Sequence, residues 1–302
     1  MTLEQLLIDM PLILAEGSVA EQVRRGQPHL LHPTLVHTLL VRSPEGRRVL
    51  EELFTSYIGV ARSRGLPIIL STPTWRANPQ RLQGISGAER INGECAEFLL
   101  GIKAKNKDVE VMVNGLIGSK NDCYKPGEAP GATEAEAFHR WQAKKLAAGG
   151  VDFLIAETLP SVGEALGLAR AMAETKLPYV ISFVLSPEGT IMDGTTLSEA
   201  IDVIDNGAPI PPSGYMVNCC YPTFLERAAL KEADRERFLG IQANGSALDP
   251  RELESSTELK MEPVSEWVEA MARLKESGLG KIFGGCCGTS PEHIEALAAR
   301  LT

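Results

Sequence analysis

The feature that most constrains the fold is a regular alternation of short apolar runs with longer amphipathic stretches. Each run is bounded by residues that favour turns, as expected of buried strands. The predicted strands are residues 11–15, 67–71, 109–113, 151–156, 178–185, 214–218, 239–243 and 281–283. The spacing of apolar residues between them predicts helices that bury one face, among them residues 47–63, 135–148, 161–175 and 264–277.

Strand–helix alternation along a whole chain indicates an α/β fold with a parallel sheet. Eight strands with covering helices in 302 residues fit a single (β/α)8 barrel of the TIM type better than an open, doubly wound sheet. No G-x-G-x-x-G turn follows a predicted strand, which argues against a dinucleotide-binding fold. We therefore expect residues 1–302 to form one barrel domain.

Composition narrows the range of partners. The chain carries 30 Lys and Arg against 39 Asp and Glu, a formal net charge of −9, whereas nucleic-acid recognition normally needs a basic surface. It has no apolar run of about 18 residues that could cross a bilayer. Its acidic first residues, 1–5, are unlike a secretory signal. We expect a cytoplasmic protein that binds neither nucleic acid nor membrane; whether it forms a homo-oligomer is left open.

Cysteine placement is the second informative feature. The six cysteines comprise two adjacent pairs and two single residues: Cys219-Cys220, Cys286-Cys287, Cys95 and Cys123. Six cysteines in a chain of this length are too sparse for a disulfide scaffold. We expect the two single cysteines to pack as small apolar residues, the usual fate of a free cysteine. For the pairs, metal ligands, redox groups and packed core residues all remain open.

The pairs follow the sixth and eighth predicted strands, whose ends can share a site on the C-terminal rim of a barrel. Thiolates select zinc, and three protein ligands with one open position are typical of a catalytic zinc site. Consecutive strand residues point to opposite faces, so adjacent cysteines normally cannot bind one ion. Gly284, Gly285 and Gly288 let the backbone turn around the second pair, whereas only Pro222 follows the first. We therefore expect one ligand from the first pair, with four packed core cysteines as the alternative.

Loops after strand ends carry the chemistry of barrel enzymes. Residues 115–131 follow the third predicted strand and contain four glycines and two prolines, so we predict a lid or a substrate wall there. The segment with Pro209, Pro211 and Pro212 precedes a strand instead. We expect it at the opposite face of the barrel.

Four segments resemble the zinc-dependent homocysteine S-methyltransferases, the family that includes the betaine and S-methylmethionine enzymes. Residues 283–294 (FGGCCGTSPEHI) and the pair Asn218-Cys219 are similar to the family's cysteine motifs. Residues 150–158 (GVDFLIAET) are similar to its strand ending in a substrate-binding glutamate, and residues 72–75 (TPTW) to its Thr-x-Thr-aromatic segment. The similarity extends over essentially the whole chain. It implies a homocysteine-binding (β/α)8 barrel with a bound Zn²⁺ ion.

The resemblance also implies roles for single residues. Glu157 would hold the ammonium group of the amino-acid substrate, and Thr72 or Thr74 would help to place that substrate. Asn218 would shape the site beside the metal. The zinc ligands would be Cys219, Cys286 and Cys287.

Two positions add to this picture from the sequence itself. The family usually ends its first strand with Asp-Gly-Gly, whereas this chain has Glu16 followed by Gly17 and Ser18. Glu16 supplies the same charge one methylene further out, so we expect an acidic role in a pocket of altered shape. Trp75 lies at the end of a strand and could face a cationic methyl donor through a cation–π contact, with ordinary packing as the alternative.

The chemistry implied is transfer of a methyl group from a sulfonium or quaternary ammonium donor to the thiol of homocysteine, which gives methionine. Zinc coordination removes the thiol proton, and the thiolate is the nucleophile. Three cysteine thiolates and the acceptor thiolate leave Zn²⁺ with an excess of negative charge, which favours a cationic donor. A zinc hydrolase is an alternative, although such sites usually use His and carboxylate ligands. A thiol-rich zinc-binding or redox-sensing protein without turnover is another.

Overall fold

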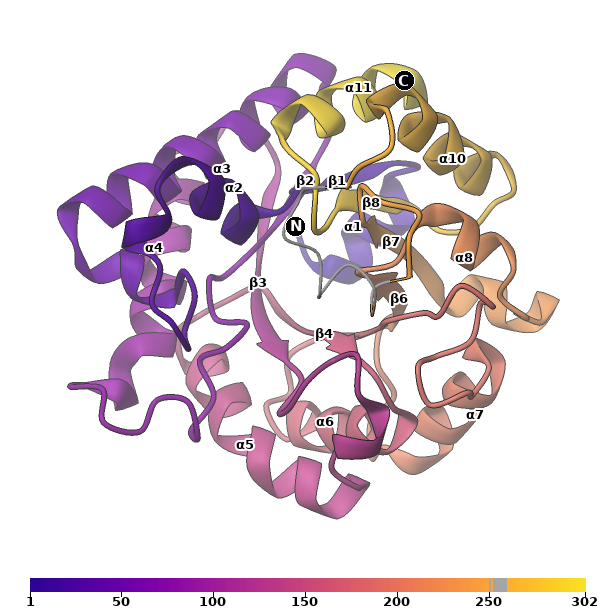
Figure 1. The fold of residues 1–302 in the computed structure, drawn as a ribbon, viewed down its shortest axis with the longest axis horizontal. Coiled ribbons are helices and arrows are strands. Elements are labelled where there is room, and N and C mark those ends of the chain that lie inside the picture. Colours follow the sequence, from indigo (N-terminus) through magenta and orange to yellow (C-terminus); the bar gives the residue numbers. More distant parts are fainter. Residues whose placement is uncertain (250, 252–259) are drawn as a thin grey trace.

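The computed structural model describes residues 1–249, 251 and 260–302. Its parallel strands close into a barrel in chain order, with β8 paired to β1, and helices surround the barrel (Figure 1). This confirms the predicted (β/α)8 fold. The strands are β1 Ile13–Ala15, β2 Ile68–Ser71, β3 Val111–Gly118, β4 Phe153–Leu159, β5 Tyr179–Phe183, β6 Gly214–Asn218, β7 Phe238–Ala243 and β8 Ile282–Gly285.

The four helices named from the sequence are present, with ends shifted by a few residues. Local signals set these ends: the Ser43 side chain accepts from the amide of Gly46 at the start of α3, and Gly65 ends that helix with a left-handed φ of 62°. The helices in the described part of the chain are α1 Leu3–Asp9, α2 Val19–Gly26, α3 Pro44–Arg64, α4 Ile91–Lys105, α5 Ala132–Ala148, α6 Val162–Ala173, α7 Leu197–Gly207, α8 Pro222–Glu226, α10 Val264–Glu276 and α11 Pro291–Leu301.

The third strand corrects one boundary. Residues 115–118, predicted as the start of a loop, continue β3, so the loop begins at Ser119. The glycines in this stretch suggest a turn, but in the structure they make room for neighbours. A Cβ on Gly115 would lie 2.8 Å from the Leu154 side chain, and one on Gly118 would collide with the Trp75 indole. Glycine here serves close packing rather than chain reversal.

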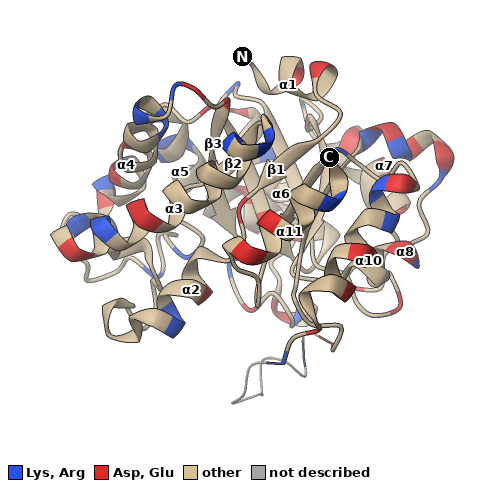
Figure 2. Ribbon diagram, turned by 90° about the horizontal axis from the view of Figure 1, so that it is seen from above, with Lys and Arg blue, Asp and Glu red and all other residues tan. Residues whose placement is uncertain are grey.

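Apolar side chains form two layers of core. The larger layer lies between the strands and the surrounding helices. The smaller one fills the barrel interior, where Ile13, Met112 and Ile282 pack together with Leu3 and Leu6 of α1. Helix α1 lies across one end of the barrel (Figure 2), and its two leucines are almost fully buried. The N-terminal end of the barrel is therefore closed, and the C-terminal rim is left for the site.

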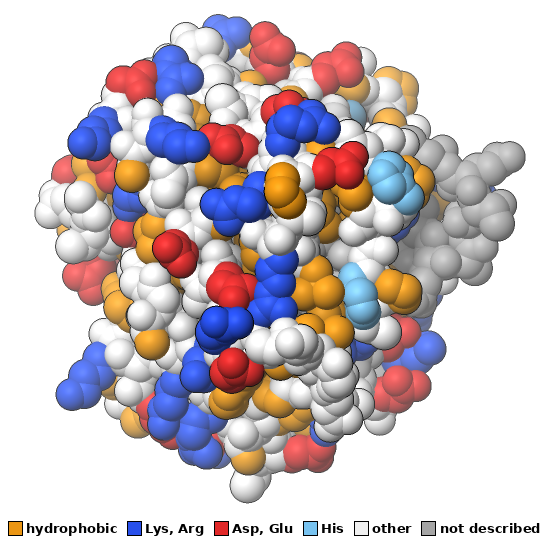
Figure 3. Space-filling view, turned by 90° about the vertical axis from the view of Figure 1, so that its left-hand side faces the viewer, with side chains coloured by type: hydrophobic (Ala, Val, Ile, Leu, Met, Phe, Trp, Pro, Cys, Tyr) orange, Lys and Arg blue, Asp and Glu red, His pale blue; other side chains and the backbone are white. Residues whose placement is uncertain are grey.

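The outer surface over α3 and α4 mixes both signs of charge (Figure 3). Arg42 pairs with Glu94 at 2.6 Å, and Lys105 pairs with Glu51 at 2.5 Å. None of the helices in the described ranges has the length and apolar character needed to cross a membrane. The proline-rich stretch at 209–212 precedes β6, at the end of the barrel opposite the cysteine pairs, as predicted.

Candidate metal centre and substrate site

Three thiols converge at the C-terminal rim. Cys219 follows β6, and Cys286 and Cys287 follow β8, which is separated from β6 only by β7. Their Sγ atoms all lie within 4.8 Å of one another, and they form the one candidate metal-binding group of His, Cys, Asp or Glu found in the described residues. Sulfurs bound at about 2.3 Å to one tetrahedral zinc lie roughly 3.8 Å apart. The donor set therefore fits zinc with a small contraction.

A sharp bend separates the members of the first pair. Cys219 adopts a left-handed φ of 54°, which is uncommon for a residue other than glycine. Its amide donates to Gln242 O at 3.2 Å, and Asn244 Nδ2 donates to Cys219 O at 3.0 Å. Cys220 is consequently buried in the outer core layer, away from the cluster of three thiols. Of this pair, only Cys219 faces the site.

The second pair leaves its strand in a turn. Gly288 has φ 85°, and Thr289 folds back so that its amide and hydroxyl both donate to Cys286 O. The carbonyl of Cys287 accepts from the amide of Gly245 at 2.8 Å. Because the pair lies in a turn, the alternation of an extended strand does not apply. Both thiols reach the same side.

The three thiols shift one another's pKa values. Hydrogen bonds from Cys219 and then Cys286 hold the pKa of Cys287 well below its ordinary value. The pKa of Cys219 is raised by its hydrogen bonds to the other two thiols and by burial. One thiolate is thus stabilised by two thiols, an arrangement in which a divalent cation can replace the remaining protons.

Two buried carboxylates lie at the same rim as the thiols. Glu157 is within β4, and burial, followed by repulsion from Glu16, raises its pKa to about 8. Glu16 follows β1, and burial raises its pKa to about 7. In the described part of the chain, Glu157 Oε1 and Glu16 Oε2 are buried without a hydrogen-bond partner. The pair is therefore arranged to receive a cation or a donor group.

The side chain of Glu16, which is one methylene longer than that of an aspartate, makes a specific contact. Its Oε1 accepts from the backbone amide of Ser71, the last residue of β2, at 2.7 Å. The bond connects β1 to β2 beyond the last paired residues of these strands. One oxygen is fixed in this way, and the other is left for the site.

The two threonines use their hydroxyl protons within the protein. Thr74 Oγ1 donates to Leu116 O at 2.6 Å, and Thr72 Oγ1 lies 2.7 Å from Thr74 Oγ1. The amide of Leu116 donates to Thr72 Oγ1 at 3.0 Å. Since Thr74 donates to the carbonyl, Thr72 must donate to Thr74. Both residues connect β2 to β3, and neither hydroxyl retains a proton for a ligand.

Asn218 ends β6 and is fully buried. Its Oδ1 accepts from the amide of Thr158 at 2.9 Å and from the hydroxyl of Ser182 at 2.8 Å. Its Nδ2 has no partner among the described residues. Thr158, which the sequence does not single out, has a left-handed φ of 59° where the pairing of β4 with β5 is irregular. Asn218 holds this unusual backbone beside Glu157.

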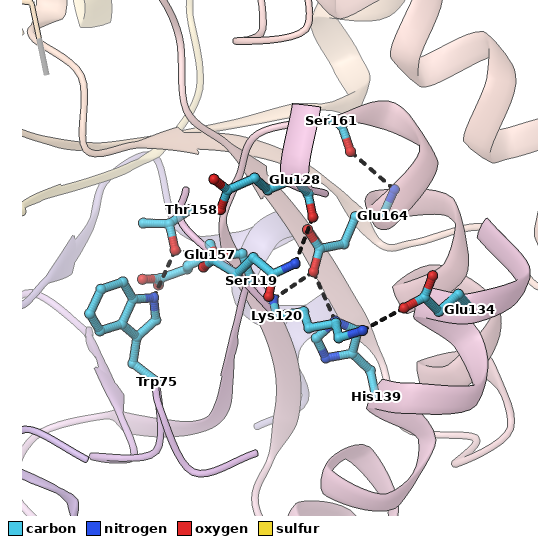
Figure 4. Close-up of polar contacts among 11 residues, drawn as sticks. Trp75, Ser119, Lys120, Glu128, Glu134, His139, Glu157, Thr158, Ser161 and Glu164 are labelled. Atoms are coloured by element: carbon cyan, nitrogen blue, oxygen red, sulfur yellow. Dashed lines mark hydrogen bonds and ion pairs between the residues drawn. The ribbon is translucent and has the colours of Figure 1, made fainter. Parts of the chain in front are cut away.

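Trp75 is fixed by a single hydrogen bond. Its Nε1 donates to Thr158 Oγ1 at 2.7 Å, and its ring lies beside Glu157 and Thr158 (Figure 4). The Arg76 guanidinium carbon lies 4.0 Å from the centre of the indole ring. A cation of the protein itself therefore already lies over the indole, which the cation–π interpretation of the sequence did not include.

The loop at residues 119–131 supplies two further side chains. Cys123 packs with Val184 and Cys219 in a small apolar cluster, and Tyr124, Trp75 and Cys286 pack against it. Cys123 is buried, as predicted, although its neighbours are the site thiols. Burial and then the four cysteines nearby raise the pKa of Tyr124 well above its ordinary value. No motif in the sequence identified Tyr124; its place in a loop that follows a barrel strand was the one available signal.

The barrel and the thiols on its rim define a class of (β/α)8 proteins with a cysteine-lined metal site at the C-terminal ends of the strands. The chain belongs to the homocysteine S-methyltransferase family, whose model matches residues 13–301. This confirms the resemblance inferred from the cysteine motifs.

Individual relatives support the same family assignment. The chain is 25% identical to homocysteine S-methyltransferase YbgG of Bacillus subtilis, over 98% of this chain and 96% of that protein. It is 28% identical to homocysteine S-methyltransferase 2 of Arabidopsis thaliana over 54% of this chain, a match that covers 49% of the plant protein. The metallated form of the homocysteine methyltransferase MmuM from Escherichia coli has the same fold, with a TM-score of 0.75, 23% identity and 99% coverage of both chains.

Proposed function

We propose that this chain transfers a methyl group from an onium donor, a sulfonium or quaternary ammonium compound, to the thiol of homocysteine. Membership of the family supports the reaction. The observation that carries the proposal is the arrangement of the site: three thiols within 4.8 Å of one another, with two incompletely bonded carboxylates buried at the same end of the barrel. An amino acid bearing a thiol has the matching pair of groups.

We propose Zn²⁺ as the metal, held by the thiols of Cys219, Cys286 and Cys287. Three sulfur donors within this distance suit a soft or borderline cation and are a poor fit for magnesium or calcium. When bound, zinc lowers the pKa of a thiol acceptor and keeps its sulfur in the thiolate form. The three thiols provide the fixed negative charge around that sulfur.

The acceptor's ammonium group is assigned to Glu157 and Glu16. A carboxylate buried without a partner is costly, and an ammonium group supplies both the charge and the hydrogen bonds that are missing. Ser71 fixes one oxygen of Glu16 and limits how far its carboxylate can move. These contacts would hold the amino acid with its sulfur directed toward the thiols.

Methyl transfer then needs no side-chain base. A carbon–sulfur bond forms between the acceptor thiolate and the methyl carbon, and the bond from that carbon to the donor's sulfonium sulfur or ammonium nitrogen breaks. The bonding electrons stay with the donor, which becomes neutral, and the acceptor becomes the thioether methionine. The acceptor thiolate loses its negative charge and the donor its positive charge, so the excess of negative charge beside the cysteine thiolates is relieved, which favours the forward step.

The test uses purified, zinc-loaded protein with homocysteine and a panel of methylated sulfonium and ammonium compounds. Mass spectrometry reports which donor loses a methyl group and whether methionine forms. We expect methionine with at least one onium donor and none when homocysteine is left out. Retained zinc without methyl transfer to any of a broad set of thiols would favour the alternative of a zinc-binding or redox-sensing protein.

A further inference from the structure

The loop at residues 119–131 brings a phenol group to the thiols. Tyr124 packs against the cluster of Cys123, Val184 and Cys219, with Cys286 beside it. Its backbone amide donates to Asp122 Oδ1 at 2.9 Å. In the described ranges, its hydroxyl has no hydrogen-bond partner. A half-buried phenol beside three thiols, with an unused proton, is the feature that the reaction above does not explain.

Four other hydroxyl groups around the site already use their protons. Thr74 donates to Leu116 O, and Thr72 donates to Thr74. Ser182 donates to Asn218 Oδ1, and Thr158 donates to its neighbour's carbonyl, Glu157 O, at 2.5 Å. Tyr57 OH also lacks a partner among the described residues, but it lies near Glu16, whereas Tyr124 packs against the cysteines.

The loop is held from below by a buried acid (Figure 4). The Glu164 carboxylate accepts from the backbone amide of Lys120 at 2.6 Å and lies 3.0 Å from His139 Nε2. Glu164 and His139 are both 0% exposed, and they come from α6 and α5, the two helices that follow the loop. Lys120 extends in the other direction, toward Glu134, at 2.5 Å. Lys120, near the start of the loop, is therefore fixed to α5 and α6.

The rest of the loop folds on itself. Ser119 Oγ donates to Asn121 O at 3.1 Å, and Asn121 Nδ2 donates to Glu128 O at 2.6 Å. These bonds join the two ends of a short segment that contains Tyr124. Because Glu164 holds Lys120 and Asn121 closes the segment, the position of the phenol depends on a carboxylate that itself does not touch the site.

We propose that Tyr124 is a further active-site residue, whose hydroxyl donates a hydrogen bond to the sulfur of the thiol acceptor, and that Glu164 is the residue that positions it. The inference rests on the proposed function, since it requires a thiol acceptor beside the three cysteines. A neutral phenol, with an ordinary pKa near 10, can donate to a thiolate without cancelling its charge. The bond would fix one lone pair of the sulfur and leave another for the methyl carbon.

Tyr124→Phe tests the first part, because it removes the hydroxyl and keeps the ring. The dissociation constant of homocysteine is measured by calorimetry on zinc-loaded protein without a donor. A hydrogen bond to a charged group predicts binding weaker by about ten- to a hundredfold. Zinc content should not change. As a second readout, the visible spectrum of cobalt-substituted protein should respond less to homocysteine in the variant.

Tyr221→Phe is the matched control. Tyr221 lies on the same rim, immediately after Cys220, and is also largely buried. It precedes α8 and has no role in the site, so homocysteine should bind this variant as it binds the parent. Equal binding to parent and Tyr124→Phe would overturn the inference. A parent that binds no homocysteine would instead refute the proposed function.

Glu164→Leu tests the positioning role, with Glu164→Gln as the conservative variant that still offers an oxygen to Lys120. We expect the leucine variant to weaken homocysteine binding and the glutamine variant to restore it. In the Tyr124→Phe background, Glu164→Leu should add little, because the bond it supports is already absent. Full additivity would overturn the positioning role. The Tyr124→Phe result stands whether or not Glu164→Leu folds.

Discussion

On one side of the site, the thiols of Cys219, Cys286 and Cys287 are held by the backbone: a left-handed residue after β6 and a glycine turn after β8. On the other side, the carboxylates of Glu16, just after β1, and Glu157, within β4, are left partly without partners. Below, these are called the thiol side and the carboxylate side. Both sides bring acidic groups together, but Cys287 is exposed whereas both carboxylates are buried.

The two sides differ in the cation that neutralises their charge. Thiols arranged within 4.8 Å suit a resident metal, which stays through many turnovers. Carboxylates with raised pKa values and open oxygens suit a charge that arrives and leaves with the substrate. We infer that the thiol side is a permanent centre and the carboxylate side a transient one. Four experiments test this difference between the two sides.

Removing one thiol should have the largest effect on zinc binding and on methyl transfer. Cys219→Ser, Cys286→Ser and Cys287→Ser each take away a soft ligand, so we expect loss of zinc and of all methyl transfer. Cys220→Ser is the control, because Cys220 lies in the outer core, and it should keep its zinc. Metal analysis of the four purified variants gives the answer. Zinc lost from Cys220→Ser but kept by Cys219→Ser would reverse the assignment.

Glu157→Gln should leave zinc binding unchanged and weaken the binding of homocysteine. The amide nearly keeps the shape of the carboxylate but removes its charge, and a hydrogen bond to a charged group contributes roughly 1.5–3 kcal/mol. Homocysteine should therefore bind about ten- to a hundredfold more weakly. Calorimetry measures the affinity, and metal analysis of the same sample checks the zinc. An unchanged dissociation constant would remove Glu157 from the carboxylate side.

Gly288→Ala examines how the thiol side is held. Gly288 has φ 85°, and a side chain in that region costs about 1–2 kcal/mol. We expect lower stability in urea and several-fold weaker zinc binding, because the turn that directs Cys286 and Cys287 is strained. Gly127→Ala, at a loop glycine with open space around it, should change neither quantity. Equal zinc affinity in both variants would show that the turn does not depend on this glycine.

The smallest effect is expected in the pH dependence of the stability of the metal-free protein. The folded pKa values of Glu16 and Glu157, about 7 and about 8, lie above the ordinary value of 4.5, so the folded state binds more protons than the unfolded state between about pH 4.5 and 8. Stability contributed by these groups is therefore present at low pH and lost as pH rises through that window. Thermal unfolding at pH 5–7.5 should show a steeper decline for the parent than for the double variant Glu16→Gln, Glu157→Gln. Parallel curves would contradict the raised pKa values.

The sequence predicted the scaffold of the site well, because strand ends in a barrel are set by local patterns. The apolar run 214–218 coincides with β6, so the sequence alone predicts Cys219 at the rim. Glycines around Cys286 and Cys287 signalled a turn, and the structure has one there. The same logic failed at residues 115–118, where glycine serves close packing with Trp75 and Leu154 and the strand continues.

What the sequence could not give are contacts between elements far apart in the chain. Thr72 and Thr74 form hydrogen bonds with the backbone of Leu116 in β3. The Ser71 amide donates to Glu16 because β1 and β2 are paired. The loop that carries Tyr124 is bonded through the Lys120 amide to a carboxylate 44 residues later, Glu164. Residue types and spacing alone do not encode such distances.

The floor of the barrel has a practical meaning for anyone who engineers this chain. Leu3 and Leu6 of α1 fill the interior from below, so deleting that helix would open an apolar chamber to water and invite aggregation. Thr302 is exposed at the end of α11, on the outside of the molecule. Affinity handles, reporters and immobilisation chemistry therefore belong at that end, where the rim and the floor are both left undisturbed.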